Sequence, residues 1–260
     1  MLRGGGSVEL TLEQKQSLSR DGFVRLPRAV PRDLVDVALR AINASLGEQG
    51  IDPAQLTKFR SQSYCPELQD APVIADLVRR SEVWSYAESA IGHGMLEPLG
   101  RGQIALRFPS LEPLRAPHPH IDGMYTPTNG VPKGTIHNFT ALVGIVLSDI
   151  TRPDMGNLTV WPGSHLQYEQ SFRERGPQAL LEGMPNVALA EPVQLTGEPG
   201  DAVLCHYQLG HGIAGNSSPN IRYAIYFRLK HVDHDAIHWE CMTDIWRKWE
   251  GMRDVLGART

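Results

Sequence analysis

The sequence has few cysteines, and they lie far apart. Cys65, Cys205 and Cys241 are the only three in 260 residues, and no two of them form a Cys-x-x-Cys pair. An odd, widely spaced set fits free thiols in a reducing compartment better than a disulfide framework. We therefore expect a cytoplasmic protein.

Long apolar runs are also missing. The longest apolar-rich segment, Phe139 to Leu147, is far shorter than the roughly 20 residues that a membrane-spanning helix needs. The first residues, MLRGGGSVEL, lack the apolar core of a secretory signal peptide. The sequence therefore predicts no membrane association.

Neither sign of charge is in excess. The chain has 25 basic and 29 acidic residues, a formal net charge of -4, and no run of like charge stands out. A nucleic-acid backbone requires a basic surface, so we expect a small-molecule substrate and no nucleic-acid partner. A hydrophobic fraction of 41% in a chain of 260 residues is enough for one domain with a sizeable core. The oligomeric state is not indicated.

About the first hundred residues are predicted to be mainly helical. Thr11 and Gln14 form a capping box that begins a short helix, which ends near Asp21-Gly22. A strand follows at Phe23–Leu26. Pro31 begins an amphipathic helix with Gly47 as its expected C-terminal glycine, and a further helix is predicted over Val73–Ile91.

From about residue 101 to 230 the pattern is typical of short strands separated by turn residues. No alternating helices interrupt the series, which favours an antiparallel sandwich or jelly roll and a mainly β (α+β) fold. The segment from about 231 to 260 is predicted to end in a helix over Asp244–Leu256. Since there is no internal repeat or linker, residues 1–260 are interpreted as a single domain. The predicted strands are Gln103–Phe108, Phe139–Ser148, Asn157–Trp161, Ala202–Tyr207 and Arg222–Leu229.

His120 and Asp122 are candidate metal ligands. On a strand, residues two apart point to the same face, so both side chains can reach one ion while Ile121 packs behind. With a second histidine, His211, they complete the two-histidine, one-carboxylate set that binds iron(II) and leaves three positions open.

A His-x-Asp tripeptide alone is weak, because a chain with ten histidines is expected to contain roughly one by chance. A second copy, His231-Val232-Asp233, is present, and no strand is predicted after it. We interpret that copy as part of a solvated loop. The set of His120, Asp122 and His211 is preferred for its context.

His211 and Arg222 are expected to lie near the same cavity. A Gly/Asn/Ser/Pro turn separates them, which is typical of a hairpin that brings both strand ends together. The planar guanidinium of Arg222 can bind a carboxylate with two hydrogen bonds. Alternation places it on one face of its strand with Ala224 and Tyr226.

The sequence contains, in this order, the motifs LTLEQKQSLSRDGFVRLPRAVP, HIDG, GNLTVWPGSH and EPGDAVLCHYQLGHGIAGNSSPNIRYAIYF. Together they resemble the phytanoyl-CoA dioxygenase family of iron(II)/2-oxoglutarate oxygenases. The resemblance implies a double-stranded β-helix, a cupin-like jelly roll, with helices outside it. It also implies that His120, Asp122 and His211 are the iron ligands and that Arg222 binds the C5 carboxylate of 2-oxoglutarate.

Two further positions bear on the cosubstrate. Arg107 falls where relatives often have a basic residue near 2-oxoglutarate, although a solvent-facing arginine on a half-buried strand fits the pattern equally well. Gly144 departs from the family, since many relatives have a tryptophan there that lines the cosubstrate pocket. That contact is not transferred, and either a wider pocket or another side chain takes its place.

The resemblance implies an enzyme that uses Fe(II), 2-oxoglutarate and O2 and yields succinate and CO2. Because Asp122 is a carboxylate, hydroxylation of an unactivated C–H bond in a small or medium-sized metabolite is the default outcome; desaturation, ring closure and epoxidation stay open. Two other classes also stay open: a zinc or manganese jelly-roll hydrolase or isomerase that does not use 2-oxoglutarate, and a non-catalytic small-molecule binder. Arg222 argues against the former, and the intact ligand set against the latter.

Overall fold

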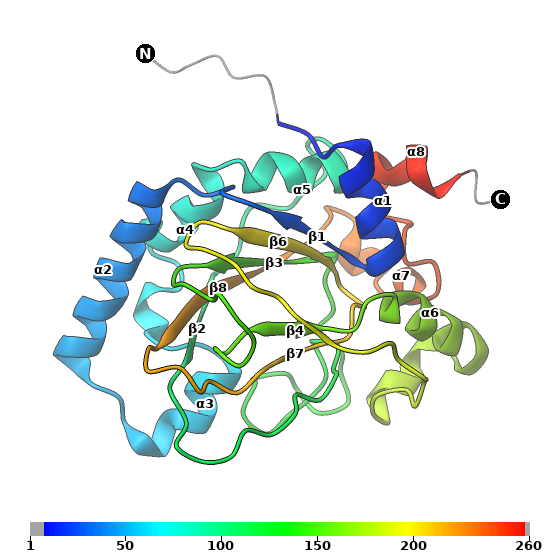
Figure 1. The fold of residues 1–260 in the computed structure, drawn as a ribbon. Helices are drawn as coiled ribbons and strands as arrows, with labels where there is room; N and C mark the ends of the chain where they lie inside the picture. The colour runs from blue at the N-terminus through cyan, green and yellow to red at the C-terminus, as the bar shows by residue number, and fades with distance from the viewer. Residues whose placement is uncertain (1–7, 258–260) are drawn as a thin grey trace.

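Two antiparallel sheets form the centre of the computed structural model, which describes residues 8–257 (Figure 1). The five-stranded sheet has the order β1-β6-β3-β8-β2, and the three-stranded sheet has the order β5-β4-β7. This double-sheet arrangement confirms the predicted jelly roll. The large sheet contains β1 (Phe23–Leu26), β2 (Gln103–Arg107), β3 (Ala141–Val146), β6 (Ala202–His206) and β8 (Arg222–Leu229). The small sheet contains β4 (Leu158–Val160), β5 (Val193–Gln194) and β7 (His211–Ile213).

Helices from the first part of the chain cover the outer face of the large sheet (Figure 1). No helix among residues 8–257 is both long and apolar enough to cross a membrane. The expectation that MLRGGGSVEL is not a signal peptide concerns residues 1–10, of which 1–7 lie outside the described part of the chain. The helices are α1 (Leu12–Asp21), α2 (Arg32–Gln49), α3 (Leu56–Ser61), α4 (Pro72–Arg79), α5 (Val83–Ile91), α6 (Ser164–Arg175), α7 (Glu240–Thr243) and α8 (Arg253–Leu256).

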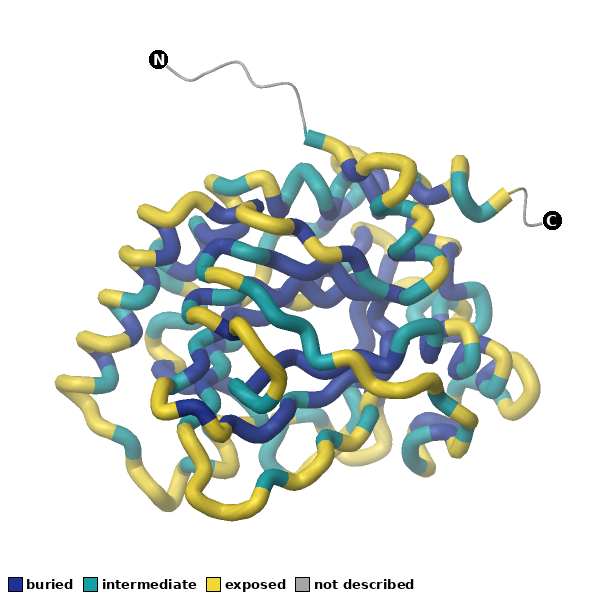
Figure 2. The backbone as a smooth tube through the Cα atoms, in the orientation of Figure 1, coloured by how far each residue is buried: buried dark blue, intermediate teal, exposed yellow. Residues whose placement is uncertain are grey.

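The alternation of side chains along the strands divides the core into two layers. On β8, Ile225 and Phe227 pack outward with the helices, whereas Ala224 and Tyr226 point between the two sheets. The central strands β3, β6 and β8 of the large sheet are buried along most of their length (Figure 2). The inner layer is therefore the one in which a site can form.

The structure contains the helices predicted in the first hundred residues, but one of them ends later than predicted and another is divided into two. The capping box of Thr11 and the cap at Gly22 are both present. Gly47 is inside α2, which continues to Gln49 and is capped by Gly50. The expected helix over 73–91 is two helices, because the Ser81 hydroxyl bonds back to the Leu77 carbonyl and accepts the amide of Val83.

The predicted C-terminal helix over 244–256 was also wrong. Only short helical segments occur there, and two tryptophans anchor them. Trp246 and Trp249 are 5% and 2% exposed, and their rings lie 5.0 and 5.3 Å from the ring of His206. Burial of these large rings, rather than helix propensity, sets the path of the chain.

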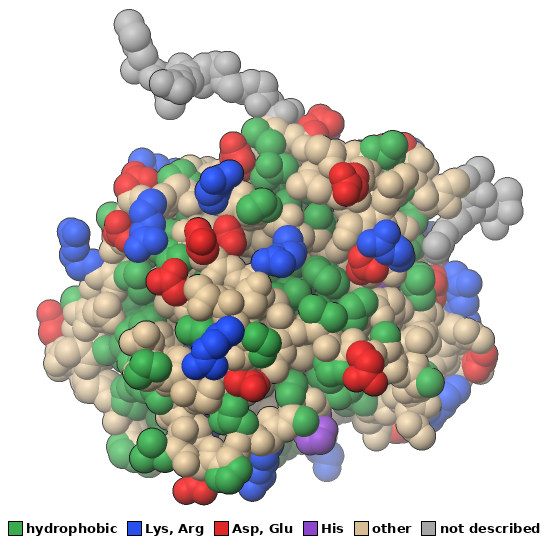
Figure 3. Space-filling view, viewed as in Figure 1, with side chains coloured by type: hydrophobic (Ala, Val, Ile, Leu, Met, Phe, Trp, Pro, Cys, Tyr) green, Lys and Arg blue, Asp and Glu red, His purple; other side chains and the backbone are tan. Residues whose placement is uncertain are grey.

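Charges on the surface are mixed. Figure 3 shows lysine and arginine side chains interspersed with aspartate and glutamate over the face in view. Most ion pairs of the described residues are exposed, such as Arg32 with Asp36 and Arg175 with Glu182. Such pairs contribute little to stability, so apolar burial holds the fold together.

His206 makes stability depend on pH. Burial, followed by the charge of His165, lowers the pKa of His206 to about 3. Its ring geometry agrees, because Nδ1 accepts the Gln208 amide at 3.0 Å and Nε2 lies 2.9 Å from the Ile245 carbonyl. Only the neutral Nε2–H form satisfies both contacts.

Above pH 6.5 the folded and unfolded chains both keep this histidine neutral, whereas below it only the unfolded chain takes up the proton. As the pH falls below 6.5, we expect this group to lower the free energy of unfolding with a slope that approaches about 1.4 kcal/mol per pH unit near pH 5. Urea denaturation should show a shallower slope in His206→Gln. The exposed His93→Gln is the control, and equal slopes in wild type and His206→Gln would contradict the prediction.

Candidate metal centre

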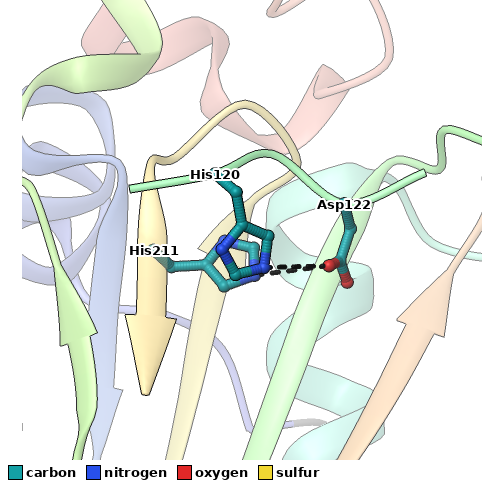
Figure 4. A group of neighbouring side chains, drawn as sticks. All are labelled: His120, Asp122 and His211. Atoms are coloured by element: carbon teal, nitrogen blue, oxygen red, sulfur yellow. Dashed lines mark ion pairs between the residues drawn. The ribbon is translucent and has the colours of Figure 1, made fainter. Parts of the chain in front are cut away.

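A direct backbone pairing brings His120 and His211 together. Each donates its amide to the carbonyl of the other at 3.0 Å, which forms an isolated antiparallel bridge beside β7. Their rings lie 4.5 Å apart. Asp122 is two residues further along, so its side chain returns to the same side and points at both imidazoles (Figure 4).

The three side chains have the geometry of a metal site. Oδ1 of Asp122 lies 3.5 Å from Nε2 of His120 and 3.6 Å from Nε2 of His211. All three ligand atoms fall within 4.8 Å of one another. Metal–ligand bonds of roughly 2.1 Å put adjacent ligands about 3 Å apart, so a modest contraction around an ion completes the set.

Backbone carbonyls fix the two imidazoles. Nδ1 of His211 lies 3.0 Å from the Leu209 carbonyl, which can only accept, so Nδ1 holds the proton and Nε2 offers a lone pair. The backbone of His118 likewise bonds the ring of His120. Burial lowers the pKa of His120, but the hydrogen bond and charge of Asp122 outweigh it and raise the pKa above its ordinary value.

Arg228 binds the other oxygen of Asp122. Its Nε and Nη2 donate to Oδ2 at 3.0 and 2.6 Å. Burial raises the pKa of Asp122, but Arg228 first, and then His120 and His211, outweigh it and hold the pKa well below its ordinary value. Sequence reasoning missed Arg228, although it lies on the same alternating face of β8 as Arg222.

A cavity of about 440 Å³ contains the three ligands. Both sheets contribute to its wall, together with α3 and the segment after Asp122. The lining includes Arg60, Tyr64, Gln103, Arg107, Met124, Tyr125, Asn129, Met184, Ile213, Arg222, Tyr226 and Arg228. The predicted site residues therefore all face one space.

Arg222 is a buried cation without a carboxylate partner among the described residues. Its side chain is anchored by hydrogen bonds from Nε to the Gly156 carbonyl at 2.7 Å and from Nη1 to the Ala105 carbonyl at 2.9 Å. Only 3% of the residue is exposed, and burial lowers its pKa. Burying an unpaired charge is costly, so this arrangement indicates an anionic ligand.

Arg107 adds a second positive charge at the same point. It is the direct cross-strand partner of Arg222 in the β2–β8 pair, and Gly156 packs against both side chains. A Cβ at position 156 would come within 2.8 Å of Arg107 and 3.2 Å of Arg222. Burial, then the charges of Arg222 and Arg60, lowers the pKa of Arg107. Like charges directly opposite destabilise a sheet unless an anion lies between them.

The predicted hairpin between His211 and Arg222 was wrong, although both residues line the same cavity. His211 begins β7 in the small sheet, and Arg222 begins β8 in the large sheet. The turn residues between them lead from one sheet to the other. Asn216 bonds the carbonyls of Arg107 and Asn220 and so holds this crossing in place.

Tyr226 occupies the space beside Gly144. The two residues pair across β3 and β8, and a Cβ at position 144 would lie 2.9 Å from Cε1 of Tyr226. A tryptophan does not fit there while the phenol keeps this position. A second cavity of about 170 Å³ lies on this side, with Gly144, Arg222 and Tyr226 in its wall.

The second His-x-Asp tripeptide is not a metal site, but its predicted solvated loop was wrong for His231. That histidine is 1% exposed and bridges to Leu96, and its Nδ1 accepts the amide of Asp233. The Asp233 side chain is 63% exposed and pairs with Lys248. No second histidine joins them within the described residues.

Comparisons with known proteins found one matching family model and several solved structures of similar fold. The model of the family "Phytanoyl-CoA dioxygenase (PhyH)" matches residues 18–224. No curated protein matches the sequence. Solved structures with the same fold include HygX from Streptomyces hygroscopicus, with nickel and 2-oxoglutarate bound, which is 18% identical with a TM-score of 0.58 over 86% of this chain and 88% of that one.

Two other solved structures are similar. EctD from S. alaskensis, with 2-oxoglutarate and 5-hydroxyectoine, is 20% identical with a TM-score of 0.57, over 86% of this chain and 77% of that one. SnoK, a non-heme alpha ketoglutarate dependent carbocyclase from nogalamycin biosynthesis, is 20% identical with a TM-score of 0.55, over 90% of this chain and 93% of that one. At these identities the likeness shows a shared fold.

Metal binding tests the site without any cosubstrate. We expect the protein to bind one equivalent of Mn²⁺ and Asp122→Ala to bind it at least 100-fold more weakly, because one of three ligands is lost. Asp233→Ala removes the same group from the other tripeptide and is the matched control. Isothermal titration calorimetry measures both, and equal affinities in the two variants would contradict the assignment.

Proposed function

The chain belongs to the phytanoyl-CoA dioxygenase family, and on that premise we propose that it is an iron(II)/2-oxoglutarate-dependent dioxygenase that hydroxylates an unactivated C–H bond. Substrate, 2-oxoglutarate and O2 would give hydroxylated substrate, succinate and CO2. The observation that carries this proposal is one cavity with two features: a complete ligand set and two facing arginines that have no acidic partner among residues 8–257.

His120, Asp122 and His211 would hold the iron. Two imidazole nitrogens and one carboxylate oxygen suit Fe(II) and occupy three of its six positions. When bound, the metal supplies the redox chemistry that O2 activation requires. The protein holds the ligands in orientation through the carbonyl of Leu209 and the guanidinium of Arg228.

Arg222 would bind the C5 carboxylate of 2-oxoglutarate, with Arg107 beside it. Since Nε and Nη1 of Arg222 are held by backbone carbonyls, Nη2 keeps its donors for a ligand. The Tyr64 hydroxyl is a further donor, because the residue is 2% exposed, lines the cavity and has no hydrogen-bond partner in the part of the chain that the structure describes. A dicarboxylate would satisfy these groups and the metal together.

The substrate would be a small or medium-sized metabolite. A cavity of about 440 Å³ that also holds 2-oxoglutarate has room for a molecule of modest size. Its wall combines apolar groups, such as Met124 and Met184, with the polar groups of Gln103 and Asn129. Such a wall suits a substrate that has both apolar and hydrogen-bonding parts.

We also propose that residues 1–260 form one cytoplasmic domain. A single apolar cluster joins Leu18 of α1, Ile42 of α2, Phe227 of β8 and Trp249 near the C-terminus. The N-terminal part also contributes β1, whose Phe23 pairs with Cys205 of β6. No part of this cluster is separable without exposing core surface. Cys65 and Cys205 are buried free thiols, which suits a reducing compartment.

The paired arginines also bear on the alternative of a metal hydrolase or isomerase that does not use 2-oxoglutarate. Such an enzyme has no need of buried cations beside its metal. In the cosubstrate-free state Arg107 and Arg222 repel one another. Binding of a carboxylate relieves that repulsion, which favours the oxygenase.

Anaerobic titration tests the cosubstrate site. Iron(II) and 2-oxoglutarate should give the visible charge-transfer absorption of the chelate in wild type. Arg222→Gln should weaken 2-oxoglutarate binding at least 100-fold, because a buried charge-assisted pair is lost, while Mn²⁺ binding is retained. Arg175→Gln, which breaks an exposed ion pair with Glu182, is the control. Unchanged 2-oxoglutarate affinity in Arg222→Gln would contradict this role.

Turnover under isotopic oxygen tests the reaction itself. Metabolites that stabilise the protein with Co²⁺ and 2-oxoglutarate, measured by differential scanning fluorimetry, would be incubated with iron(II), ascorbate and ¹⁸O₂. We expect equimolar succinate and product, with one ¹⁸O atom in each. A product without the label, or product formation that does not need 2-oxoglutarate, would reject hydroxylation by this route.

A further inference from the structure

The two oxygens of the Asp122 carboxylate face different partners. Oδ1 points to the imidazoles of His120 and His211, and Oδ2 accepts both hydrogen bonds from Arg228. One carboxylate oxygen, Oδ1, therefore faces the candidate metal position, and the other, Oδ2, is bound by the protein. Neither histidine forms its ion pair with Oδ2 (Figure 4).

Arg228 is itself held in this direction. Its Nη2 also donates to Oε1 of Gln103 at 2.9 Å, and its guanidinium carbon lies 5.7 Å from the centre of the Phe139 ring. Gln103 comes from β2 and Phe139 from the residues just before β3, so the neighbours of β8 on both sides support the guanidinium. The position of Arg228 is thus built into the sheet.

This division bears on how many metal positions stay open. A carboxylate can bind a metal through one oxygen or through both. Bound through both, Asp122 would occupy one of the three positions that 2-oxoglutarate and O2 require. We propose that Arg228 is a positioning residue that restricts Asp122 to one metal-facing oxygen and so keeps the third position open. This inference rests on the proposed function.

The strength of the contact supports this role over that of an ordinary surface pair. The side chain of Asp122 is 16% exposed and that of Arg228 is 39% exposed, so solvent reaches only part of the pair. Two charge-assisted bonds converge on one oxygen, and the guanidinium is also fixed by Gln103. To bind the metal with both oxygens, the carboxylate would have to give up both bonds.

The experiment compares, in the same variants, the affinity for the metal and the affinity of the iron(II)/2-oxoglutarate complex for nitric oxide. In Arg228→Gln, Oδ2 is released and competes for the third position. We expect the Mn²⁺ affinity to stay within threefold of wild type or to become tighter. The iron(II) complex with 2-oxoglutarate, identified by its charge-transfer absorption, should bind nitric oxide, a stable probe of the O2 position, at least tenfold more weakly, because the chelating cosubstrate fills the two positions that remain. Arg228→Lys still places a charged donor against Oδ2 and should recover most of this loss. Arg175→Gln is again the control.

Other outcomes would overturn the inference. A parallel loss of Mn²⁺ and nitric oxide affinity in Arg228→Gln means that the arginine only supports the local structure. Unchanged nitric oxide affinity, or a lysine variant as weak as the glutamine variant, means that a charge on Oδ2 does not keep the position open. If wild type itself gives no charge-transfer absorption, the proposed function fails and this inference fails with it.

Discussion

The site depends on one pair of backbone hydrogen bonds, those that join His120 and His211. Side chains on directly paired residues lie on the same face of a sheet, so this contact alone puts two imidazoles side by side. Asp122 is two residues after His120, so strand alternation alone places its carboxylate on the same side as the two imidazoles. The carbonyls that bind the two rings lie in the same two segments. A one-residue shift in this pairing would turn one ring away and dismantle the centre.

Strand β8 provides the second organising element. Its inner face carries Arg222, Ala224, Tyr226 and Arg228. At a rise of about 3.3 Å per residue, the Cα atoms of the two arginines are roughly 20 Å apart. The two guanidiniums differ in their partners: Arg228 binds the carboxylate of Asp122, whereas Arg222 has no carboxylate partner within the described chain. One strand thus supports the candidate metal ligand Asp122 at one end and places the unpaired guanidinium of Arg222 at the other.

The sequence predicted what is periodic and local, and it missed what depends on distant pairing. Alternation located β8 to the residue and placed Arg222 with Ala224 and Tyr226. The same alternation includes Arg228, but nothing near it in the chain indicates that its partner is Asp122. The hairpin failed because turn residues look alike whether a chain returns to its own sheet or crosses to the facing one. The occupant of the space at Gly144 likewise required the β3–β8 register, which no local pattern contains.

The arginine pair is costly to the fold in the absence of a ligand. Arg107 and Arg222 oppose each other across two strands, and each loses solvation by burial. A strand that holds two like charges together without a ligand must be stabilised by other contacts. In β8 these contacts come from Ile225 and Phe227, which pack in the layer covered by the helices. Backbone carbonyls rather than acidic side chains hold Arg222 in place, so its charge stays uncompensated. The guanidinium of Arg222 therefore stays available to attract a negatively charged ligand.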